Sequence, residues 1–132
     1  MHKSRLLAFK GEHLLVLEKI GLKKQYTFPG GIQKKRETDC DALIREVEEE
    51  IDLQLNRKDL TYFISRRNIT KDKREVYKHY FVTTKDIENI DLLEPEKFKR
   101  ALWIPWYQAL EYLDKEDRSA VILYCEQFNE IN

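Results

Sequence analysis

GIQKKRETDCDALIREVEEEIDL, residues 31–53, is the most informative stretch of this chain, because it predicts a helix with a chemically distinct side. Thr38, followed three residues later by Asp41, resembles a capping box, so the helix is expected to begin at Asp39. The residues that follow contain neither Gly nor Pro. The helix is therefore predicted to continue to Ile51.

The predicted helix has an apolar face and a charged face at the helical spacing of about 100° per residue. The apolar face, which is expected to pack on the core, consists of Ile44, Val47 and Ile51. The charged face, which is expected to lie in water, consists of Asp41, Arg45 and Glu48. The helix should therefore pack through one side only.

A third face of the same helix is acidic and consists of Glu46, Glu49 and Glu50. Like charges at this spacing repel one another and destabilise a helix, unless a cation lies between them. Carboxylates without His or Cys nearby suit hard ions, so the sequence predicts a site for Mg2+, with Mn2+ as an alternative. A solvated acidic face is the other reading, although Glu48 already supplies the solvent-facing acid and Arg45 can orient Glu49.

The spacing of seven residues in this stretch, G-x5-E-x7-R-E-U-x-E-E with U aliphatic, resembles the Nudix box. The matching residues are Gly31, Glu37, Arg45, Glu46, Val47, Glu49 and Glu50. Two further segments resemble the family: YTFPGG at 26–31, which leads into the box, and WIP at 103–105, in a late strand. The resemblance implies the Nudix fold, an α/β/α sandwich with a mixed β-sheet, as a single domain over residues 1–132.

The resemblance also implies roles for individual residues. The implied metal ligands are Glu46, Glu49, Glu50 and Gly31. Arg45 would hold the catalytic carboxylates, and Glu37 would brace the loop. The proton of the attacking water would pass to a glutamate of the box, such as Glu46 or Glu49, or to an acid of a late loop. For the late loop Glu96 is the candidate, with Glu94 as its substitute.

Two positions depart from the family pattern. Asp52 stands where a Gly normally ends the helix, and Asp tolerates the left-handed conformation better than most residues. A modest loss of stability is therefore expected at Asp52. Arg36 stands before Glu37 where Gly is usual, which leaves room for a different loop geometry.

The implied activity is metal-dependent pyrophosphohydrolysis of a nucleoside triphosphate or nucleoside diphosphate derivative, by attack of water on phosphorus. Candidate substrate contacts are Phe28, Arg66, Tyr77 and Trp103, although the aromatic residues also fit a core. The main alternative is a Nudix-fold module that senses a nucleotide with little or no turnover. Hydrolysis of an RNA 5′ end is a further alternative. An isomerase of the isopentenyl-diphosphate type would need a catalytic cysteine, and neither Cys40 nor Cys125 is a convincing nucleophile.

Composition limits the partners and the compartment. The chain has 132 residues, of which 42% are hydrophobic and 36% charged, as expected of one globular domain. Its 24 basic and 24 acidic residues balance, which argues against bulk nucleic acid as the main partner and leaves a small-molecule substrate. No apolar run is long enough to span a bilayer and the two cysteines are isolated, so a cytoplasmic protein without membrane contact is expected. A homodimer is compatible with the sequence.

The three histidines do not form a recognisable ligand pattern. His2, His13 and His79 show no HxxxH or similar spacing, so the sequence argues against a zinc site.

The rest of the chain alternates strands and helices. Strands are predicted at 5–9, 14–17, 26–28, 60–67, 75–83 and 101–104. Later helices are predicted at 105–113, with Pro105 as the first residue, and at 117–128. Hairpins are expected around residues 10–12 and 68–73, and an irregular connection at 86–98.

Overall fold

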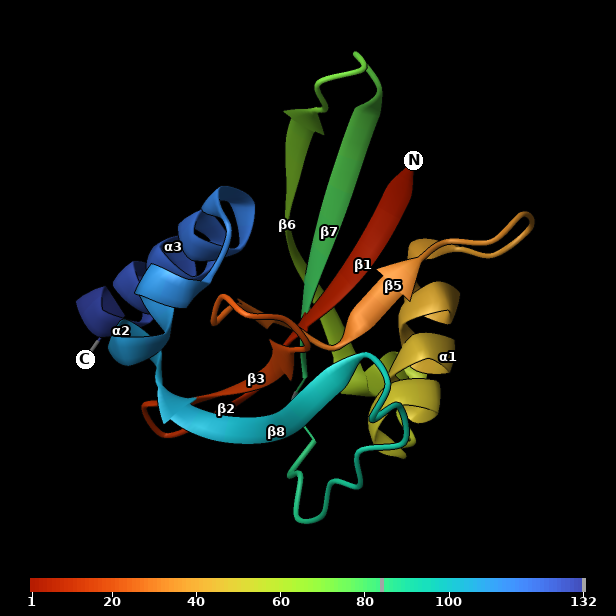
Figure 1. The fold of residues 1–132 in the computed structure, drawn as a ribbon. Helices are drawn as coiled ribbons and strands as arrows, with labels where there is room; N and C mark the ends of the chain where they lie inside the picture. The colour runs from red at the N-terminus through yellow and green to blue at the C-terminus, as the bar shows by residue number, and fades with distance from the viewer. Residues whose placement is uncertain (84, 132) are drawn as a thin grey trace.

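Two four-stranded β-sheets form the centre of the molecule, and the helices pack outside them (Figure 1). The computed structural model describes residues 1–83 and 85–131. The first sheet has the order β5-β1-β7-β6 and consists of β1 (His2–Leu7), β5 (Gly30–Ile32), β6 (Leu60–Ile69) and β7 (Glu75–Thr83). The second sheet consists of β2 (Phe9–Lys10), β3 (His13–Lys19), β4 (Tyr26–Thr27) and β8 (Phe98–Pro105).

The helices lie on two sides of these sheets (Figure 1). Helix α1 (Asp39–Ile51) covers one side, and α2 (Trp106–Ala109) and α3 (Lys115–Ile131) lie on the other. Two short 3-10 helices are η1 (Arg57–Asp59) and η2 (Leu110–Tyr112). The first sheet is mixed, because β1 and β7 run parallel while its other pairs are antiparallel. The predicted α/β/α sandwich with a mixed sheet is therefore confirmed.

The N-terminal strands pair differently from the prediction. The expected hairpin of residues 5–9 with 14–17 survives only at its tip, where β2 pairs with β3 and Gly11 turns the chain with φ 56°. β1 instead joins the other sheet, between β5 and β7. Leu6 and Leu7 are both fully buried, as in a central strand with a core on each face. The hairpin partner predicted for this strand was wrong.

Two hydrophobic clusters flank the strands. The cluster under α1 includes Leu6, Leu15, Leu43, Val47 and Ile51. The cluster on the side of α2 and α3 includes Leu7, Val16, Tyr80, Ala120 and Val121. Consecutive residues of β1 and of β3 enter opposite clusters, because side chains alternate along a strand. The two strands therefore join both halves of the core.

Helix α1 has the predicted bounds, Asp39–Ile51. The hydroxyl of Thr38 accepts a hydrogen bond from the backbone N–H of Asp41 at 3.1 Å, which confirms the predicted cap. Val47 is fully buried, as predicted, whereas Ile44 is only partly covered.

The remaining elements are close to their predicted ranges. The hairpin of β6 and β7 is confirmed, and β6 extends two residues further than expected. β8 begins at Phe98, earlier than residue 101. Pro105 is the cap of α2 and not its first residue, and the helix passes at once into η2. In the part of the chain that the structure describes, no helix is long and apolar enough to cross a membrane.

Asp52 ends α1 in the left-handed conformation, with φ 55° and ψ 34°. Its backbone N–H donates to the carbonyl of Glu48 at 3.1 Å, which satisfies one carbonyl of the last turn. The side chain is exposed, so the backbone conformation, more than burial, sets the requirement at this position.

Replacing Asp52 by Gly should therefore leave the free energy of unfolding unchanged or raise it by up to about 1 kcal/mol, because Gly carries no Cβ penalty in this conformation. Asp52→Ala is the matched control and should lower the free energy of unfolding by up to about 1 kcal/mol, because Ala keeps the Cβ penalty and lacks the tolerance of Asp for this conformation. Urea melts of the three proteins measure both effects. A clear loss of stability in Asp52→Gly would mean that the carboxylate itself stabilises the helix end.

Candidate active site

The two glycines of β5 allow close approaches that a larger residue would block, Gly30 to the backbone of β1 and Gly31 to the Glu46 side chain of α1. A Cβ on Gly31 would lie 2.4 Å from Cδ of Glu46, and one on Gly30 would lie 1.9 Å from the carbonyl oxygen of Ser4. Gly30 also has φ 141°, which L side chains rarely adopt. The Glu46 carboxylate therefore occupies the space beside the Gly31 backbone.

Glu50 is a buried carboxyl at the same place. Its exposed fraction is 4%, and the backbone N–H of Gly30 donates to its Oε1 at 2.8 Å. Burial raises the pKa of Glu50 to about 8, against the lowering effects of the Gly30 hydrogen bond and of Arg5. The negative charges of Glu46 and Glu94 raise this pKa further. The sequence placed Glu50 on the acidic face of the helix, with Glu46 and Glu49, but did not predict its burial.

Arg45 donates hydrogen bonds to three carboxylates. Its Nε and Nη2 donate to both oxygens of Glu37, at 2.7 and 2.9 Å. Its Nη1 donates to Glu46 at 2.9 Å and to Glu49 at 3.4 Å. These contacts match the orienting role expected for Arg45 and Glu37. The prediction that Arg45 faces water was wrong, since its side chain is only 22% exposed.

Glu37 in turn fixes the loop before the helix. Its Oε1 accepts from the backbone N–H of Lys34 at 2.8 Å. The hydrogen bond from Arg45, followed by that from Lys34, lowers the pKa of Glu37 to about 2. Arg36 adopts φ 72° in this loop, so the position where the family uses Gly has kept the left-handed backbone.

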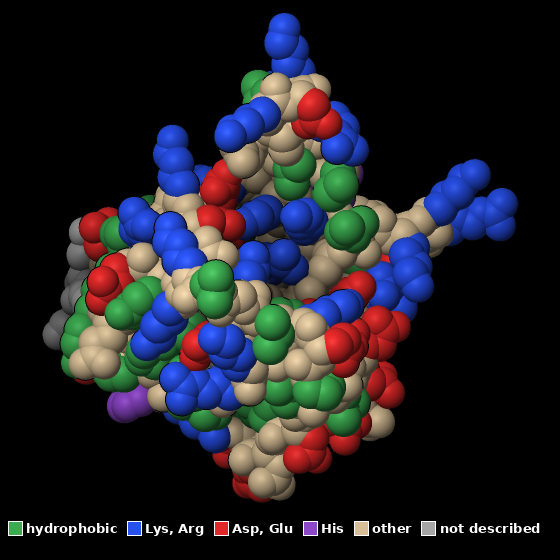
Figure 2. All heavy atoms as spheres, viewed as in Figure 1, with side chains coloured by type: hydrophobic (Ala, Val, Ile, Leu, Met, Phe, Trp, Pro, Cys, Tyr) green, Lys and Arg blue, Asp and Glu red, His purple; other side chains and the backbone are tan. Residues whose placement is uncertain are grey.

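A pocket of about 280 Å³ opens above Glu46 and Glu50, and positive charges surround it. Its cations are Lys3, Arg5, Lys19 and Lys97. Burial, followed by the charge of Arg5, lowers the pKa of Lys3, as expected where cations are crowded. Figure 2 shows Lys and Arg side chains gathered near the centre of this face. The pocket combines buried carboxylates with cations that can bind an anion.

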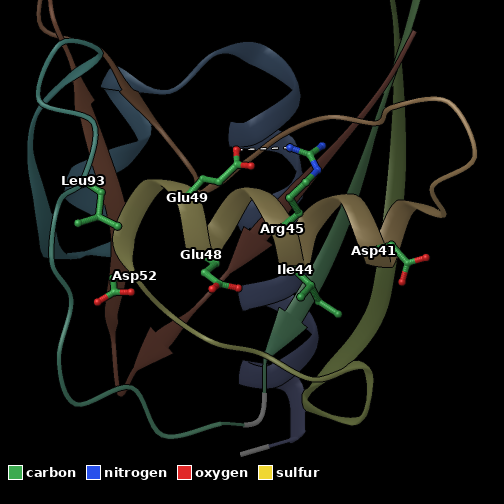
Figure 3. Close-up of a pocket in the computed structure, with 7 residues that line it drawn as sticks. All are labelled: Asp41, Ile44, Arg45, Glu48, Glu49, Asp52 and Leu93. Carbon is green, nitrogen blue, oxygen red and sulfur yellow. Dashed lines mark hydrogen bonds and ion pairs between the residues drawn. The ribbon is translucent and has the colours of Figure 1, made fainter.

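Glu49 lies on a different side of α1 from this pocket. It lines an open groove of about 590 Å³ along the outer face of the helix, together with Asp41, Ile44, Arg45, Glu48, Asp52 and Leu93 (Figure 3). Figure 3 shows Glu49 turned toward Arg45, the residue that also holds Glu46. The Glu49 side chain is 50% exposed, so it can move toward a ligand more freely than Glu50 can.

The late acid that approaches the carboxylates is Glu94, the substitute candidate. The negative charge of Glu94 raises the pKa of Glu50. The Oε1 of Glu94 is buried without a hydrogen-bond partner among the described residues. Its Oε2 accepts from Lys97 at 3.0 Å. Glu96 is exposed, and the structure does not bring it to the box carboxylates.

Of the four predicted substrate contacts, only Phe28 lines the pocket, and it is fully buried. The Nε of Arg66 donates to Ser119 of α3 at 3.0 Å. The ring of Tyr77 stacks on His2, with centroids 5.0 Å apart. Trp103 packs against the core under α1 and lies beneath Lys10. These three side chains are therefore not gathered at the pocket.

Comparisons with known proteins agree with this arrangement. A family model described as NUDIX domain matches residues 5–124. No curated protein sequence gives a significant match. The solution structure of the E. coli ORF135 protein has a TM-score of 0.78 at 17% identity, and the match covers 95% of this chain and 88% of that chain.

Two further solved structures resemble the chain along most of their length. A C. elegans Ap4A hydrolase in a binary complex has a TM-score of 0.76 at 16% identity, with 98% of each chain covered. The E. coli dihydroneopterin triphosphate pyrophosphohydrolase has a TM-score of 0.72 at 16% identity, with 91% of each chain covered. At these identities the structures establish a common fold. Because the NUDIX model spans nearly the whole chain, the chain belongs to the Nudix family of hydrolases.

Proposed function

We propose that this Nudix hydrolase is a Mg2+-dependent pyrophosphohydrolase that cleaves a nucleoside triphosphate or a nucleoside diphosphate derivative. The observation that carries the proposal is the pocket in which Glu46 and Glu50 lie against the Gly30–Gly31 backbone under a ring of cations. The carboxylates would bind a metal ion, and the cations would bind the phosphates of the substrate. The negative charges of both the carboxylates and the phosphates would then be balanced.

The residues fit a hard divalent cation. The available donors are carboxylate and backbone oxygens, without His or Cys among the residues lining the pocket. Gly31 leaves space for Glu46, and Glu94 offers a buried oxygen without a partner among the described residues. The ligands would be Glu46, Glu49 and Glu50, with the Gly31 backbone nearby. When bound, Mg2+ would neutralise phosphate charge and lower the pKa of a water.

The protein's own side chains would orient the substrate and accept a proton. Arg5 lines the pocket and its Nε has no hydrogen-bond partner among the described residues, so we assign its guanidinium to a phosphate oxygen. Lys3 and Lys19 lie on the same pocket and could bind the rest of the phosphate chain. Arg45 keeps Glu46 and Glu49 oriented. We assign acceptance of the water proton to Glu94, and retain Glu49 as the alternative within the box.

The named substrates of two structural neighbours support a phosphate-chain substrate. These are Ap4A and dihydroneopterin triphosphate. The pocket itself has two aromatic residues, Phe28 and Phe98, and both are buried, so neither offers a free face for a base. The pocket is therefore best suited to the phosphates, and the nucleoside would extend beyond it.

A screen of nucleoside triphosphates and nucleoside diphosphate derivatives with Mg2+ and with Mn2+ tests the proposal. Released phosphate or pyrophosphate is the readout, and binding of each compound is measured alongside by calorimetry. Turnover that requires metal supports the proposal. Tight binding without turnover would favour the alternative, a nucleotide-sensing module.

Replacing Glu49 or Glu50 by Gln should reduce turnover by a factor of roughly 100 or more, because each change removes a charged metal ligand at nearly constant shape. Glu48→Gln is the matched control, since Glu48 is exposed on the same helix and makes no contact with Arg45 among the described residues. The measurement is kcat with saturating Mg2+. Normal kcat in both Glu49→Gln and Glu50→Gln would refute the ligand assignment.

The Glu50→Gln protein should also be more stable than the wild type without metal, and increasingly so as pH rises. The folded protein holds Glu50 protonated up to a pKa of about 8, whereas the unfolded chain ionises near 4.3. The wild type therefore loses stability from about pH 4 through pH 8, and Gln removes that loss. Thermal melts in EDTA at pH 5 and pH 8 measure the difference, with Glu48→Gln as the control. An equal difference at both pH values would contradict the buried, protonated state.

Arg45→Lys should lower kcat by at least about tenfold with little change in metal affinity. Lys keeps the charge but cannot contact Glu37 through two nitrogens while also holding Glu46. Arg57→Lys is the control, because Arg57 makes an exposed ion pair with Asp41 at the start of the helix. Kinetics and metal titration of the two variants provide the comparison, and a wild-type rate in Arg45→Lys would exclude an orienting role.

A further inference from the structure

Three residues from separate elements meet at the beginning of α1, on the opposite end of the helix from Glu50. They are His2 of β1, Asp39 of α1 and His79 of β7. Their potential ligand atoms all lie within 4.8 Å of one another. Nδ1 of His2 lies 2.8 Å from Nε2 of His79, which in turn lies 3.7 Å from Oδ2 of Asp39.

The backbone brings these three side chains together. β1 and β7 run parallel, with Ser4 opposite His79 and His2 two residues away on the same side of β1. The hydroxyl of Ser4 donates to the backbone carbonyl of Asp39 at 2.8 Å, which ties the first turn of α1 to β1. The arrangement is therefore built into the fold and does not depend on the loops.

A second layer of hydrogen bonds orients His79. Oγ of Ser65 lies 2.6 Å from Nδ1 of His79, and the hydroxyl of Tyr62 lies 2.6 Å from the same Oγ. When Nδ1–H donates to Ser65, Nε2 presents its lone pair toward His2 and Asp39. Histidines that bind metals are commonly held in this way through their other ring nitrogen.

We propose that His2, Asp39 and His79 form a second metal site, selective for Zn2+ over Mg2+. Two imidazoles and one carboxylate are a typical set of three protein ligands for zinc, with water as the fourth. Mg2+ prefers oxygen ligands, so the two sites differ in donor chemistry. This inference does not depend on the proposed function.

Two of the three ligand separations are close to what zinc requires, and the third, between His2 and Asp39, is within 4.8 Å. Ligands at 2.0–2.1 Å from a tetrahedral ion lie about 3.3–3.4 Å apart. The His2–His79 separation of 2.8 Å must widen slightly, and the His79–Asp39 separation of 3.7 Å must shorten slightly. In the metal-free protein an N–H···N hydrogen bond links the two rings. His2 is exposed, so its Nδ1 proton can pass through solvent to Nε2 of the same ring, which frees the Nδ1 lone pair for the ion.

Calorimetry of the metal-stripped full chain with Zn2+, in excess Mg2+, tests the site. We expect one Zn2+ per chain and a rise in the unfolding temperature of roughly 5–10 °C at a zinc concentration about one hundred times Kd. His2→Gln should weaken zinc binding at least about tenfold, and it keeps the fold because His2 is exposed. Ser65→Ala should weaken it by about 10–100-fold through the orientation of His79.

His13→Gln is the matched control, because His13 is an exposed histidine of β3 outside the cluster, and it should bind zinc like the wild type. Glu50→Gln should also bind zinc like the wild type. The absence of zinc binding in the presence of Mg2+ would overturn the proposal. Wild-type zinc affinity in His2→Gln would overturn it as well, and loss of zinc binding in Glu50→Gln alone would place the ion at the box.

Discussion

The close packing of β1 and α1 around the Gly30–Gly31 backbone is the constraint on which the rest of the structure depends. Neither position has room for a Cβ, since Ser4 blocks one and Glu46 the other. Because β5 is hydrogen-bonded to β1, the same contact sets the carboxylates of α1 beside Lys3 and Arg5. Fold and site therefore cannot be varied independently here: a Cβ at Gly30 would displace the backbone of β1, and one at Gly31 would displace the Glu46 carboxylate.

Two glutamates of the Nudix box show how environment, and not residue type, determines charge. Burial raises the pKa of Glu50 to about 8, whereas Arg45 and a backbone N–H hold that of Glu37 near 2. Glu37 is a permanent anion that fixes Arg45. Glu50 makes no ion pair among the described residues, and the charge of Arg5 offsets only part of the effect of burial on its pKa. Burial of this carboxyl in the metal-free protein therefore favours a cation at that place.

Local patterns predicted the features that depend on neighbouring residues. The bounds of α1, its Thr38 cap and the acidic stripe follow from propensity and helical period, and the left-handed conformation of Asp52 agrees with a position where Gly is usual. Features that depend on distant partners could not be predicted in the same way. Leu6 and Leu7 show that β1 is buried but not that it pairs with β5. The sequence therefore did not predict that Lys3 and Arg5 of β1 would lie beside the carboxylates of α1. Glu94 and Glu96 look alike in the sequence, and only the path of the loop distinguishes them.

The alternation of β1 explains how one short strand can serve two sites. Its even-numbered side chains, His2 and Ser4, face the beginning of α1, whereas Lys3 and Arg5 line the pocket above Glu46 and Glu50. The histidines are far apart in sequence, so spacing rules could not detect their meeting across parallel strands. At one end of α1 the donors are oxygens, and at the other they include two imidazoles. Ligand chemistry would therefore keep Mg2+ and Zn2+ apart on one helix, although the fold holds both sets of ligands through the same strand.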